Sequence, residues 1–450
     1  MSRFAYNVFL HTVVAPFLLA YYAPRIIFRG KYRRSIRGKL GRLPTEIPFE
    51  TLPRPRLWFH AVSVGEVVAL APLTEAMKEA VPEASIIVST GTETGQDKAR
   101  EMIHLADAFL YLPLDFPSCL NPVVERIDPD LFVLMETELW PNLIASLKRR
   151  GTVIALANGR ISDRSFPRYR TFRGFFASIL HGIDLFLMTS ELDARRIGEM
   201  GAPQERIFVT GNTKFDAAVG KVPWEAEGEM RELLDLGPEA QVLVAGSTHP
   251  GENEIVLDAY QRLRQRFPRL LLILVPRHVE KTPQIVSLMR ERTMQPPYLR
   301  SSADAGEKRD GKKVVIVDRT GELFKVYSVA SVVFMGGSLV PRGGQNILEP
   351  AAWGKVVLFG PSMEDFRDAR DILIRTGCGT EVRSAEELTS RIAEHLADPI
   401  AAQRLGQSGR EEVLRHMGSS RKNAQMLAEL LASETGSSGG DMKRHGGLAR

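Results

Sequence analysis

The chain has 450 residues, of which 44% are hydrophobic and 25% charged, an ordinary globular composition that excludes a collagen-like or wholly disordered polymer. At about 100–200 residues per domain, the length excludes a single small binding module and favours two domains. The two cysteines, Cys119 and Cys378, cannot form a disulfide framework or a zinc site of the usual spacing. The net charge of +5 points to an anionic partner.

The first predicted element is an apolar helix, because Phe4 to Tyr22 contains no Asp, Glu, Lys or Arg. A helix of this length, rising about 1.5 Å per residue, nearly matches a hydrocarbon core of roughly 30 Å. We therefore expect residues 1–24 to be a membrane anchor. Asn7, His11 and Pro16 interrupt the apolar run, so a helix lying flat in the membrane interface is the alternative. A cleaved signal peptide is disfavoured, because the positive charges follow the apolar run.

A basic juxtamembrane segment and a proline-rich joint follow, over residues 25–55. No acidic residue precedes Glu46 in this segment, and by the positive-inside rule the rest of the chain then stays cytoplasmic. We expect the basic side chains to contact anionic membrane lipids, at roughly 1 kcal/mol each. Nucleic acid is the competing anion, but no aromatic platform or recognition helix accompanies the charges. The basic residues are Arg25, Arg29, Lys31, Arg33, Arg34, Arg37, Lys39 and Arg42.

Short β-branched runs then alternate with helix-length amphipathic stretches, which predicts parallel sheets covered by helices on both faces. The first set of predicted strands is Leu57–Val62, Ile86–Thr90, Leu131–Met135, Val153–Ala157, Leu185–Thr189 and Ile207–Thr210. The second set is Val242–Ala245, Leu270–Val275, Val314–Asp318, Val332–Met335 and Val356–Phe359. The predicted fold class is α/β, with two Rossmann-like doubly wound domains over 56–221 and 222–432 that face a cleft. Residues 433–450 are expected to be a disordered tail.

Ligands of such sheets bind at the carboxyl ends of the strands, so residues at those ends are candidates for chemistry. Glu66 follows the first strand at a predicted helix start, where it can be a general base or simply a first-turn carboxylate that stabilises the helix. Glu136 and Glu138 follow the third strand, and burying two carboxylates together is costly without cations. They are candidates for the same site.

The second domain contains three loops that suit an anionic ligand. The run from Gly246 to Glu254 opens a helix after a strand, and Arg277 ends the next strand, where it can bind phosphate or carboxylate. The run from Met335 to Pro350 has two Gly-Gly pairs that permit close backbone approach to a ligand. The chain has neither the Walker loop nor the Gly-x-Gly-x-x-Gly dinucleotide fingerprint. A nucleotide-sugar site is the better interpretation.

From the anchor to about Leu430 the chain resembles the 3-deoxy-D-manno-octulosonic acid (Kdo) transferases of lipopolysaccharide synthesis, which are membrane-anchored glycosyltransferases of the GT-B fold. The resemblance rests on six motifs that occur in the same order. They are His60-Ala-Val-Ser-Val-Gly-Glu66, Met135-Glu-Thr-Glu-Leu-Trp-Pro-Asn-Leu143, Gly211-Asn-Thr-Lys-Phe-Asp216, Ser247-Thr-His249, Val275-Pro-Arg-His278 and Gly336-Gly-Ser-Leu-Val-Pro-Arg-Gly-Gly-Gln-Asn-Ile-Leu-Glu349.

The resemblance implies roles for individual residues. Glu66 falls on the catalytic base of the family, and Glu136 and Lys214 fall on residues that support the transition state. The implied CMP-sugar contacts are Pro276, Arg277, Thr320, Gly321, Glu322, Asn346, Ile347, Leu348 and Glu349. Gln345 and Thr320 stand where family members commonly have His and Met.

The resemblance also implies a reaction. Glu66 takes the proton from a glucosamine hydroxyl of a lipid A precursor, lipid IVA, while that oxygen attacks the anomeric carbon of Kdo in CMP-Kdo. CMP leaves from the opposite face, so the centre inverts. The implied partners are donor, acceptor and anionic inner-leaflet lipids, with no cofactor, no metal and no nucleic acid. The implied location is the cytoplasmic side of a bacterial inner membrane.

Two rival functions share parts of this pattern. A different GT-B transferase or a nucleotide-sugar epimerase would share the sheets and the glycine-rich loop, but should not need the anchor and the basic segment. A catalytically dead lipid-binding scaffold should have lost Glu66 or Arg277, and the chain has both.

Overall fold

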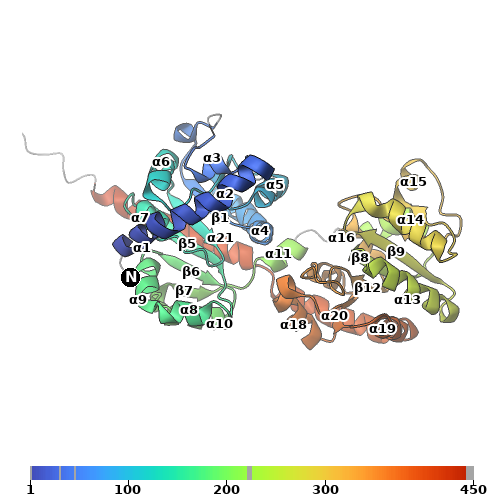
Figure 1. Ribbon diagram of the computed structural model, residues 1–450. Helices are drawn as coiled ribbons and strands as arrows, with labels where there is room; N and C mark the ends of the chain where they lie inside the picture. The colour runs from blue at the N-terminus through green and yellow to red at the C-terminus, as the bar shows by residue number, and fades with distance from the viewer. Residues whose placement is uncertain (1–2, 30–31, 45–46, 220–224, 442–450) are drawn as a thin grey trace, which may run out of the picture. The chain divides into compact units, whose positions relative to one another are not determined.

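The computed structural model of the protein describes residues 3–29, 32–44, 47–219 and 225–441. The chain divides into two compact units. Unit 1 comprises Met1–Ala217 and Met417–Arg450, and unit 2 comprises Ala218–His416 (Figure 1). The chain therefore passes from one unit to the other twice.

Unit 1 is built on a seven-stranded sheet in which all strands are parallel, in the order β3-β2-β1-β4-β5-β6-β7. Its strands are β1 (Arg56–Ala61), β2 (Ser85–Thr90), β3 (Ala108–Tyr111), β4 (Leu131–Met135), β5 (Val153–Gly159), β6 (Leu185–Met188) and β7 (Ile207–Val209). Its helices after the N-terminal segment are α3 (Ile36–Lys39), η2 (Phe49–Thr51), α4 (Val64–Ala80), α5 (Glu93–Met102), α6 (Pro117–Ile127), α7 (Pro141–Lys148), α8 (Phe166–Thr171), α9 (Arg173–Leu180), α10 (Glu191–Glu199), η3 (Gln204–Arg206), α11 (Lys214–Val219) and α21 (Ser419–Asp441).

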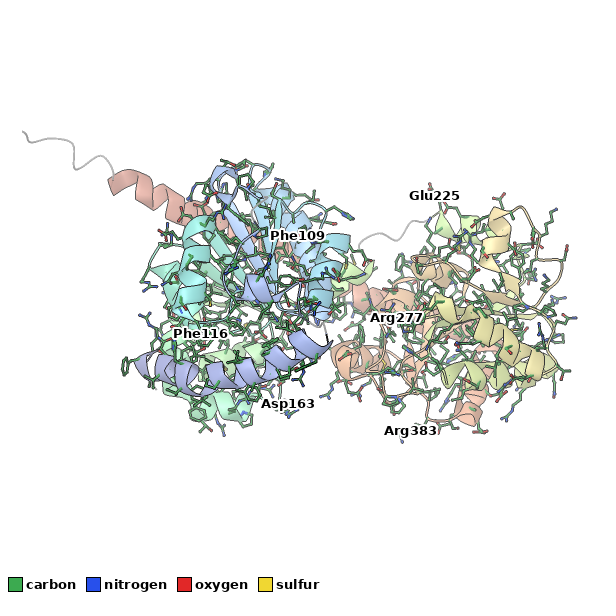
Figure 2. The ribbon with its side chains drawn as sticks, turned by 45° about the horizontal axis from the view of Figure 1, so that its top comes forward. Phe109, Phe116, Asp163, Glu225, Arg277 and Arg383 are labelled. Atoms are coloured by element: carbon green, nitrogen blue, oxygen red, sulfur yellow. The ribbon has the colours of Figure 1, made fainter. Side chains whose placement is uncertain are left out.

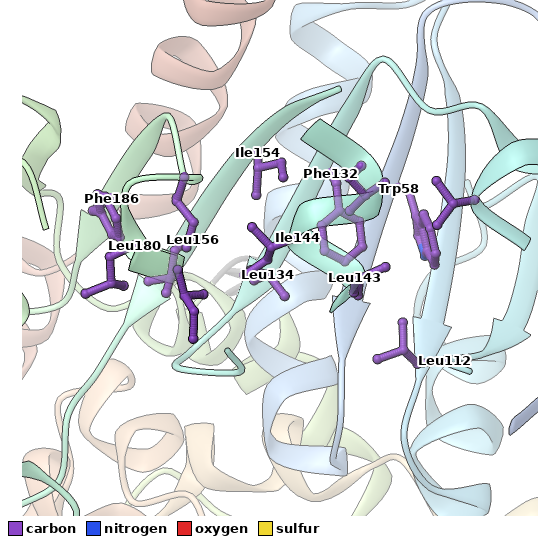
Figure 3. Packing of buried hydrophobic residues seen from close by; sticks show 14 of the residues in the cluster. Trp58, Leu112, Phe132, Leu134, Leu143, Ile144, Ile154, Leu156, Leu180 and Phe186 are labelled. Carbon is purple, nitrogen blue, oxygen red and sulfur yellow. The ribbon is translucent and has the colours of Figure 1, made fainter. Parts of the chain in front are cut away.

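Both faces of this sheet are buried, because successive side chains of a strand point to opposite faces. Trp58, Phe132 and Phe186 pack on one face with Leu143 of α7 and Leu180 of α9 (Figure 3). The alternate strand residues form a second cluster on the other face with α4 and α21. Two-sided burial of this kind requires the nearly continuous apolar runs from which the strands were predicted.

Unit 2 repeats the plan with the order β10-β11-β9-β8-β12-β13-β14, again all parallel. Its strands are β8 (Gln241–Thr248), β9 (Leu270–Pro276), β10 (Tyr298–Leu299), β11 (Val314–Ile316), β12 (Val332–Met335), β13 (Val356–Phe359) and β14 (Gly379–Glu381). Its helices are α12 (Ala226–Leu233), α13 (Glu252–Arg266), η4 (Val279–Lys281), α14 (Thr282–Glu291), α15 (Arg300–Asp304), α16 (Leu323–Val326), η5 (Tyr327–Val329), α17 (Leu348–Ala352), η6 (Glu364–Phe366), α18 (Arg367–Arg375), α19 (Ala385–Ala397) and α20 (Pro399–Arg415).

Every predicted strand lies on an observed strand, and the fold class is confirmed as two Rossmann-like units. The structure adds β3, β10 and β14, which the sequence analysis did not predict. All three lie at sheet edges and have four residues or fewer. Strands of two to four residues are too short for their periodicity to be distinctive in the sequence, even where every residue is hydrophobic, as in β3.

The C-terminal boundary differs from the expectation. Residues 417–432 were assigned to the second domain, but α21 packs in unit 1 against α4 and β5. Ala424, Leu427 and Leu431 are buried there in the core cluster beneath β1 and β4. Residues 433–441 continue this helix, where we expected a disordered tail, and residues 442–450 lie outside the described residues.

The N-terminal apolar segment is helical from Arg3 to Arg29, as α1 (Arg3–Phe9), a π-helical turn η1 (Leu10–Val14) and α2 (Ala15–Arg29). Residues 3–26 are long and apolar enough to cross a membrane. The basic segment after it is only partly available to lipid. Arg34 pairs with Asp97, and Lys39, expected to face headgroups, is buried and donates to the Tyr22 hydroxyl at 3.3 Å. Lys31 lies outside the described residues.

Candidate functional site

Glu66 lies in the first turn of α4, directly after β1. Its Oε2 accepts the Val62 N–H at 2.7 Å and its Oε1 accepts the Ser63 hydroxyl at 3.0 Å. Each oxygen retains a further lone pair, so the turn orients the carboxylate without saturating it. The side chain is 8% exposed, and this burial raises the pKa of Glu66, with a further upward contribution from the charge of Glu136. A raised pKa suits a base that works near neutral pH.

Glu136 and Lys214 form an ion pair, with 3.0 Å between Nζ and Oε1. Glu136 follows β4 with φ at 55°, a left-handed conformation that is unfavourable outside glycine. Its N–H donates to the Ala157 carbonyl of the neighbouring strand at 2.9 Å, which fixes this conformation. Lys214 begins α11, and its N–H donates to Asn212 Oδ1 at 2.9 Å. Backbone contacts thus hold both partners of the pair.

Glu138 completes a group of three carboxylates with one lysine. Burial raises the pKa of Glu138 to about 7, and the charges of Glu66 and Glu136 add to the shift. Like charges that share a site oppose each other's ionisation in this way. The group lies after β1, β4 and β7, at the carboxyl edge of the unit 1 sheet. The structure therefore brings Glu66, Glu136 and Lys214 together, although they are far apart in the sequence.

The predicted nucleotide contacts lie at the corresponding edge of unit 2. Pro276 is the last residue of β9 and Arg277 follows it, with its N–H donating to the Thr248 carbonyl at 3.0 Å. The Arg277 side chain is exposed (Figure 2), and it has no partner within the described ranges. A guanidinium at a strand end without a carboxylate partner is suited to a phosphate.

Thr320, Gly321 and Glu322 follow β11, the neighbour of β9 in the sheet. Thr320 and Gly321 are exposed. Glu322 Oε1 accepts from the Arg300 guanidinium at 2.9 Å, whereas its Oε2 is buried and has no hydrogen-bond partner in the described part of the chain. Buried acceptors are nearly always paired, so this oxygen can take a donor from a ligand.

Asn346 and Glu349 are linked at the start of α17. Asn346 Oδ1 accepts the Leu348 N–H at 3.2 Å, and its Nδ2 donates to Glu349 Oε1 at 3.2 Å. Burial raises the pKa of Glu349 to about 7. Ile347 and Leu348 are 0% and 3% exposed and belong to the core. Their side chains therefore position the turn, and only their backbone can reach a nucleotide.

Glu252 holds the glycine-rich loop, a role that was not predicted from the sequence. It begins α13 after β8 and is 0% exposed. Its Oε2 accepts the N–H groups of Gly337 at 2.7 Å and His249 at 3.0 Å. Its Oε1 accepts those of Ser338 at 3.0 Å and Leu339 at 2.9 Å. One carboxylate therefore holds four backbone N–H groups from two loops.

This contact changes the interpretation of the glycine-rich loop. Successive backbone N–H groups form an anion-binding nest, but the nest at residues 337–339 is already occupied by Glu252 of the protein itself. A Cβ on Gly336 would come within 2.5 Å of the Ser247 carbonyl oxygen, and one on Gly343 within 2.5 Å of Asp365. Gly336 and Gly343 therefore permit close packing inside the protein, where we expected close approach of a ligand.

The chain is similar to known proteins over most of its length. The family described as "3-Deoxy-D-manno-octulosonic-acid transferase (kdotransferase)" matches residues 34–217. A 3-deoxy-D-manno-octulosonic acid transferase from Haemophilus influenzae is 30% identical over 433 residues, which cover 96% of this chain and 99% of that protein. A bifunctional glycosyltransferase/methyltransferase from Fusobacterium nucleatum is 36% identical over 339 residues, 75% of this chain. The match spans about half, 52%, of the Fusobacterium protein.

Among solved structures, UDP-GlcNAc 2-epimerase from Neisseria meningitidis bound to UDP-GlcNAc is similar with a TM-score of 0.55 and 12% identity. The similarity covers 84% of this chain and 99% of that one. At this identity the likeness concerns the fold, and it agrees with the paired Rossmann-like units of the GT-B architecture.

Proposed function

Because the chain belongs to the Kdo transferase family, we propose that it transfers Kdo from CMP-Kdo to a lipid A precursor in lipopolysaccharide synthesis. The single observation that carries the proposal is the placement of Glu66 beside the Glu136–Lys214 ion pair. An oriented carboxylate with a raised pKa, next to a lysine, can remove a proton from a hydroxyl and tolerate the charge that develops.

In the proposed reaction, Glu66 removes the proton of a glucosamine hydroxyl as that oxygen forms a bond to the anomeric carbon of Kdo. The bond from this carbon to the CMP phosphate oxygen breaks on the opposite face, and both electrons leave with CMP. The anomeric centre is therefore inverted. Lys214, held by Glu136 at 3.0 Å, supplies positive charge for the anionic sugar and phosphate. Each role matches what the side chain can donate or accept.

The donor is proposed to bind along the carboxyl edge of unit 2. Arg277 pairs with the phosphate, since its guanidinium is exposed and unpartnered in the described part of the chain. Glu349 accepts from the ribose hydroxyls, and Pro276 and the backbone of residues 320–322 and 346–348 border the nucleotide. Positive side chains supply the counter-charge, so the proposal needs neither a metal nor a cofactor. The expected location is the cytoplasmic face of a bacterial inner membrane.

The experiment is to incubate the purified protein with CMP-Kdo and a tetraacylated lipid A precursor, and to weigh the lipid product by mass spectrometry. We expect mass increments of whole Kdo residues, whose number counts the sugars added. The parallel measurement is CMP binding by calorimetry. Binding of CMP without any mass increment would contradict the proposed transfer and favour a nucleotide-binding scaffold.

A further inference from the structure

The N-terminal helical segment, residues 3–29, runs along the surface of unit 1 (Figure 1). Near its start, the side chains of Asn7 and Asn142 are paired, with nitrogen-to-oxygen distances of 3.3 and 2.7 Å. One turn later, the His11 ring packs edge-on against Phe116 with 5.1 Å between centroids. Near its end, Tyr22 accepts from Lys39 at 3.3 Å. The segment is therefore held at both ends.

The contact near the start is polar and buried. The Tyr6 hydroxyl donates to Asp115 Oδ2 at 2.9 Å, and Asp115 also accepts the N–H groups of Asn142 and Leu143, at 3.1 and 2.9 Å. Asp115 is 4% exposed. If residues 4–22 left unit 1 to cross a bilayer, these groups would lose their partners, and Tyr6 and Asn7 would enter hydrocarbon unpaired. Unsatisfied polar groups in hydrocarbon cost several kcal/mol each.

The outward side of the same segment is strongly apolar. Side chains along its whole length are exposed, which is unfavourable in water over so large a contiguous strip. These are Phe4 (78% exposed), Val8 (45%), Val13 (53%), Phe17 (65%), Leu19 (70%) and Phe28 (83%). The segment thus has one side fastened to the protein and one side that lacks a partner.

A group of exposed arginines lies just before α8, on α8 and at the start of α9. Arg164, Arg168, Arg170 and Arg173 are all exposed, and none has an acidic partner among the residues that the structure describes. Phe172, between them, is 57% exposed. The ring of Phe175 in α9 lies 5.8 Å from the ring of Tyr6 in α1, so α9 lies beside the start of the apolar segment.

We propose that residues 3–29 lie lengthwise in one leaflet of an anionic bilayer while docked on unit 1, with the α8–α9 arginines against the lipid phosphates. An apolar strip, together with exposed arginines that have no acidic partner in the described part of the chain, complements acyl chains and lipid phosphates. The segment then holds the protein on one side of the membrane without crossing it. This arrangement is independent of the catalytic roles assigned above, and its tests use neither donor nor acceptor.

The first test asks whether the helix stays docked in the membrane. The variant is the full chain in which Cys119→Ser and Cys378→Ala remove the native thiols and Asn7→Cys and Asn142→Cys introduce a new pair. It is bound to vesicles of phosphatidylethanolamine and phosphatidylglycerol and then oxidised. We expect the disulfide to form as fully on vesicles as in detergent, as read by peptide mass. The control pair, Phe17→Cys with Asn142→Cys, should form none. A disulfide that forms in detergent and not on vesicles would overturn the proposal.

A second test does not depend on the cross-linked variant. A variant with Ser2→Cys as its one cysteine, in the same background without Cys119 and Cys378, is added to the outside of preformed vesicles. The vesicles are then exposed to a maleimide that does not cross the membrane. A helix lying in the outer leaflet leaves this thiol accessible from outside. If the thiol reacts with the maleimide only after detergent dissolves the vesicles, the N-terminus lies in the vesicle lumen. The segment then crosses the bilayer, and the proposal is wrong.

A third test addresses the arginines. Replacing Arg164, Arg170 and Arg173 by Gln should lower partition onto these vesicles by about tenfold or more at 0.1 M salt, and by less at high salt. The matched control replaces three exposed arginines of unit 2, Arg269, Arg290 and Arg404, and should change partition less than about twofold. Equal losses in both triple variants would show that only net charge matters and would overturn the assigned surface.

Discussion

The two units place a glutamate at equivalent positions and use it differently. Glu66 follows β1 and Glu252 follows β8, each within the first turn of the next helix. Glu66 accepts one backbone N–H and one hydroxyl and remains 8% exposed. Glu252 accepts four backbone N–H groups and is 0% exposed. The same strand–turn–helix position thus holds a carboxylate that can still accept a proton in one unit and a saturated one in the other.

The number of hydrogen-bond donors around each carboxylate decides whether it can still bind a substrate. Four N–H groups occupy the acceptor sites of the Glu252 carboxylate and leave no lone pair for a substrate. Two donors orient Glu66, and burial acts against its charge. Sequence position alone cannot distinguish the two, because the donors to Glu252 come mostly from residues 337–339, in a distant loop.

The largest expected effect is on the chemistry of Glu66. Glu66→Gln keeps the size of the side chain and removes its basicity. The rate of Kdo transfer should therefore fall by about 10²–10⁴-fold, while the affinity for CMP stays unchanged. Steady-state rates and CMP calorimetry measure the two effects separately. Glu101→Gln, an exposed carboxylate of α5 paired only with Lys98, is the matched control. A near wild-type rate for Glu66→Gln would leave Glu66 only the role of stabilising the first turn of its helix.

The next effect is on the stability of unit 2. Glu252→Gln replaces one acceptor oxygen by an NH2 group and leaves two buried N–H groups unpaired, at a cost of about 2–4 kcal/mol. Thermal unfolding should show this loss, and CMP binding should weaken because the glycine-rich loop is released. Glu254→Gln in the same helix affects one N–H, that of Gly251, and should cost less. Unchanged stability in both variants would show that the carboxylate does not hold the loop.

Donor binding should be affected to a smaller degree. Arg277→Ala removes a charged phosphate partner and Glu349→Ala removes an acceptor for the ribose, so each should weaken CMP-Kdo affinity by about tenfold or more. Arg277→Ala should not lower the stability of unit 2 as Glu252→Gln does, because Arg277 is exposed. Calorimetry with CMP checks this expectation. Wild-type affinity for CMP in both variants would show that the nucleotide binds elsewhere on the protein.

The pH dependence of the transfer rate tests the electrostatic environment of Glu66. The rate should fall as pH drops through the pKa of Glu66, because a protonated carboxyl cannot act as a base. Burial and the charge of Glu136 both raise that pKa, so Glu136→Gln should lower it and move the acid limb of kcat/KM to lower pH. An acid limb that moves to higher pH would contradict the described electrostatics.

The smallest expected effect is that of a chelator. EDTA should leave transfer nearly unchanged, since the proposal assigns the charge of the donor phosphate to a protein side chain, Arg277. The residues that the structure describes contain no group of three or more His, Cys, Asp or Glu suited to a metal. Activity lost with EDTA and restored by Mg²⁺ would contradict this expectation.

The sequence predicts the central parts of the fold well and the distant contacts poorly. The predicted strands, such as Leu131–Met135, are apolar on both faces because both faces are covered, and that pattern is visible in the sequence. Glu66 and Glu136 were found because each follows such a strand. Lys214 was found only through the family motif, because its pairing with Glu136 spans 78 residues. The docking of α21 on α4 leaves no local signal of which sheet the helix covers.

The docking of α21 on unit 1 also sets an order of events on the ribosome. Ala424, Leu427 and Leu431 fill the core beneath β1 and β4, yet they are synthesised only after all of unit 2. At about 5–20 residues per second, the roughly 200 residues of unit 2 take about 10–40 s to translate. For that time unit 1 is an incomplete domain with an apolar face of α4 uncovered, whereas unit 2 can finish first. The unit that begins the chain is thus the last to be completed, and premature termination before residue 417 would leave a nascent chain that depends on chaperones.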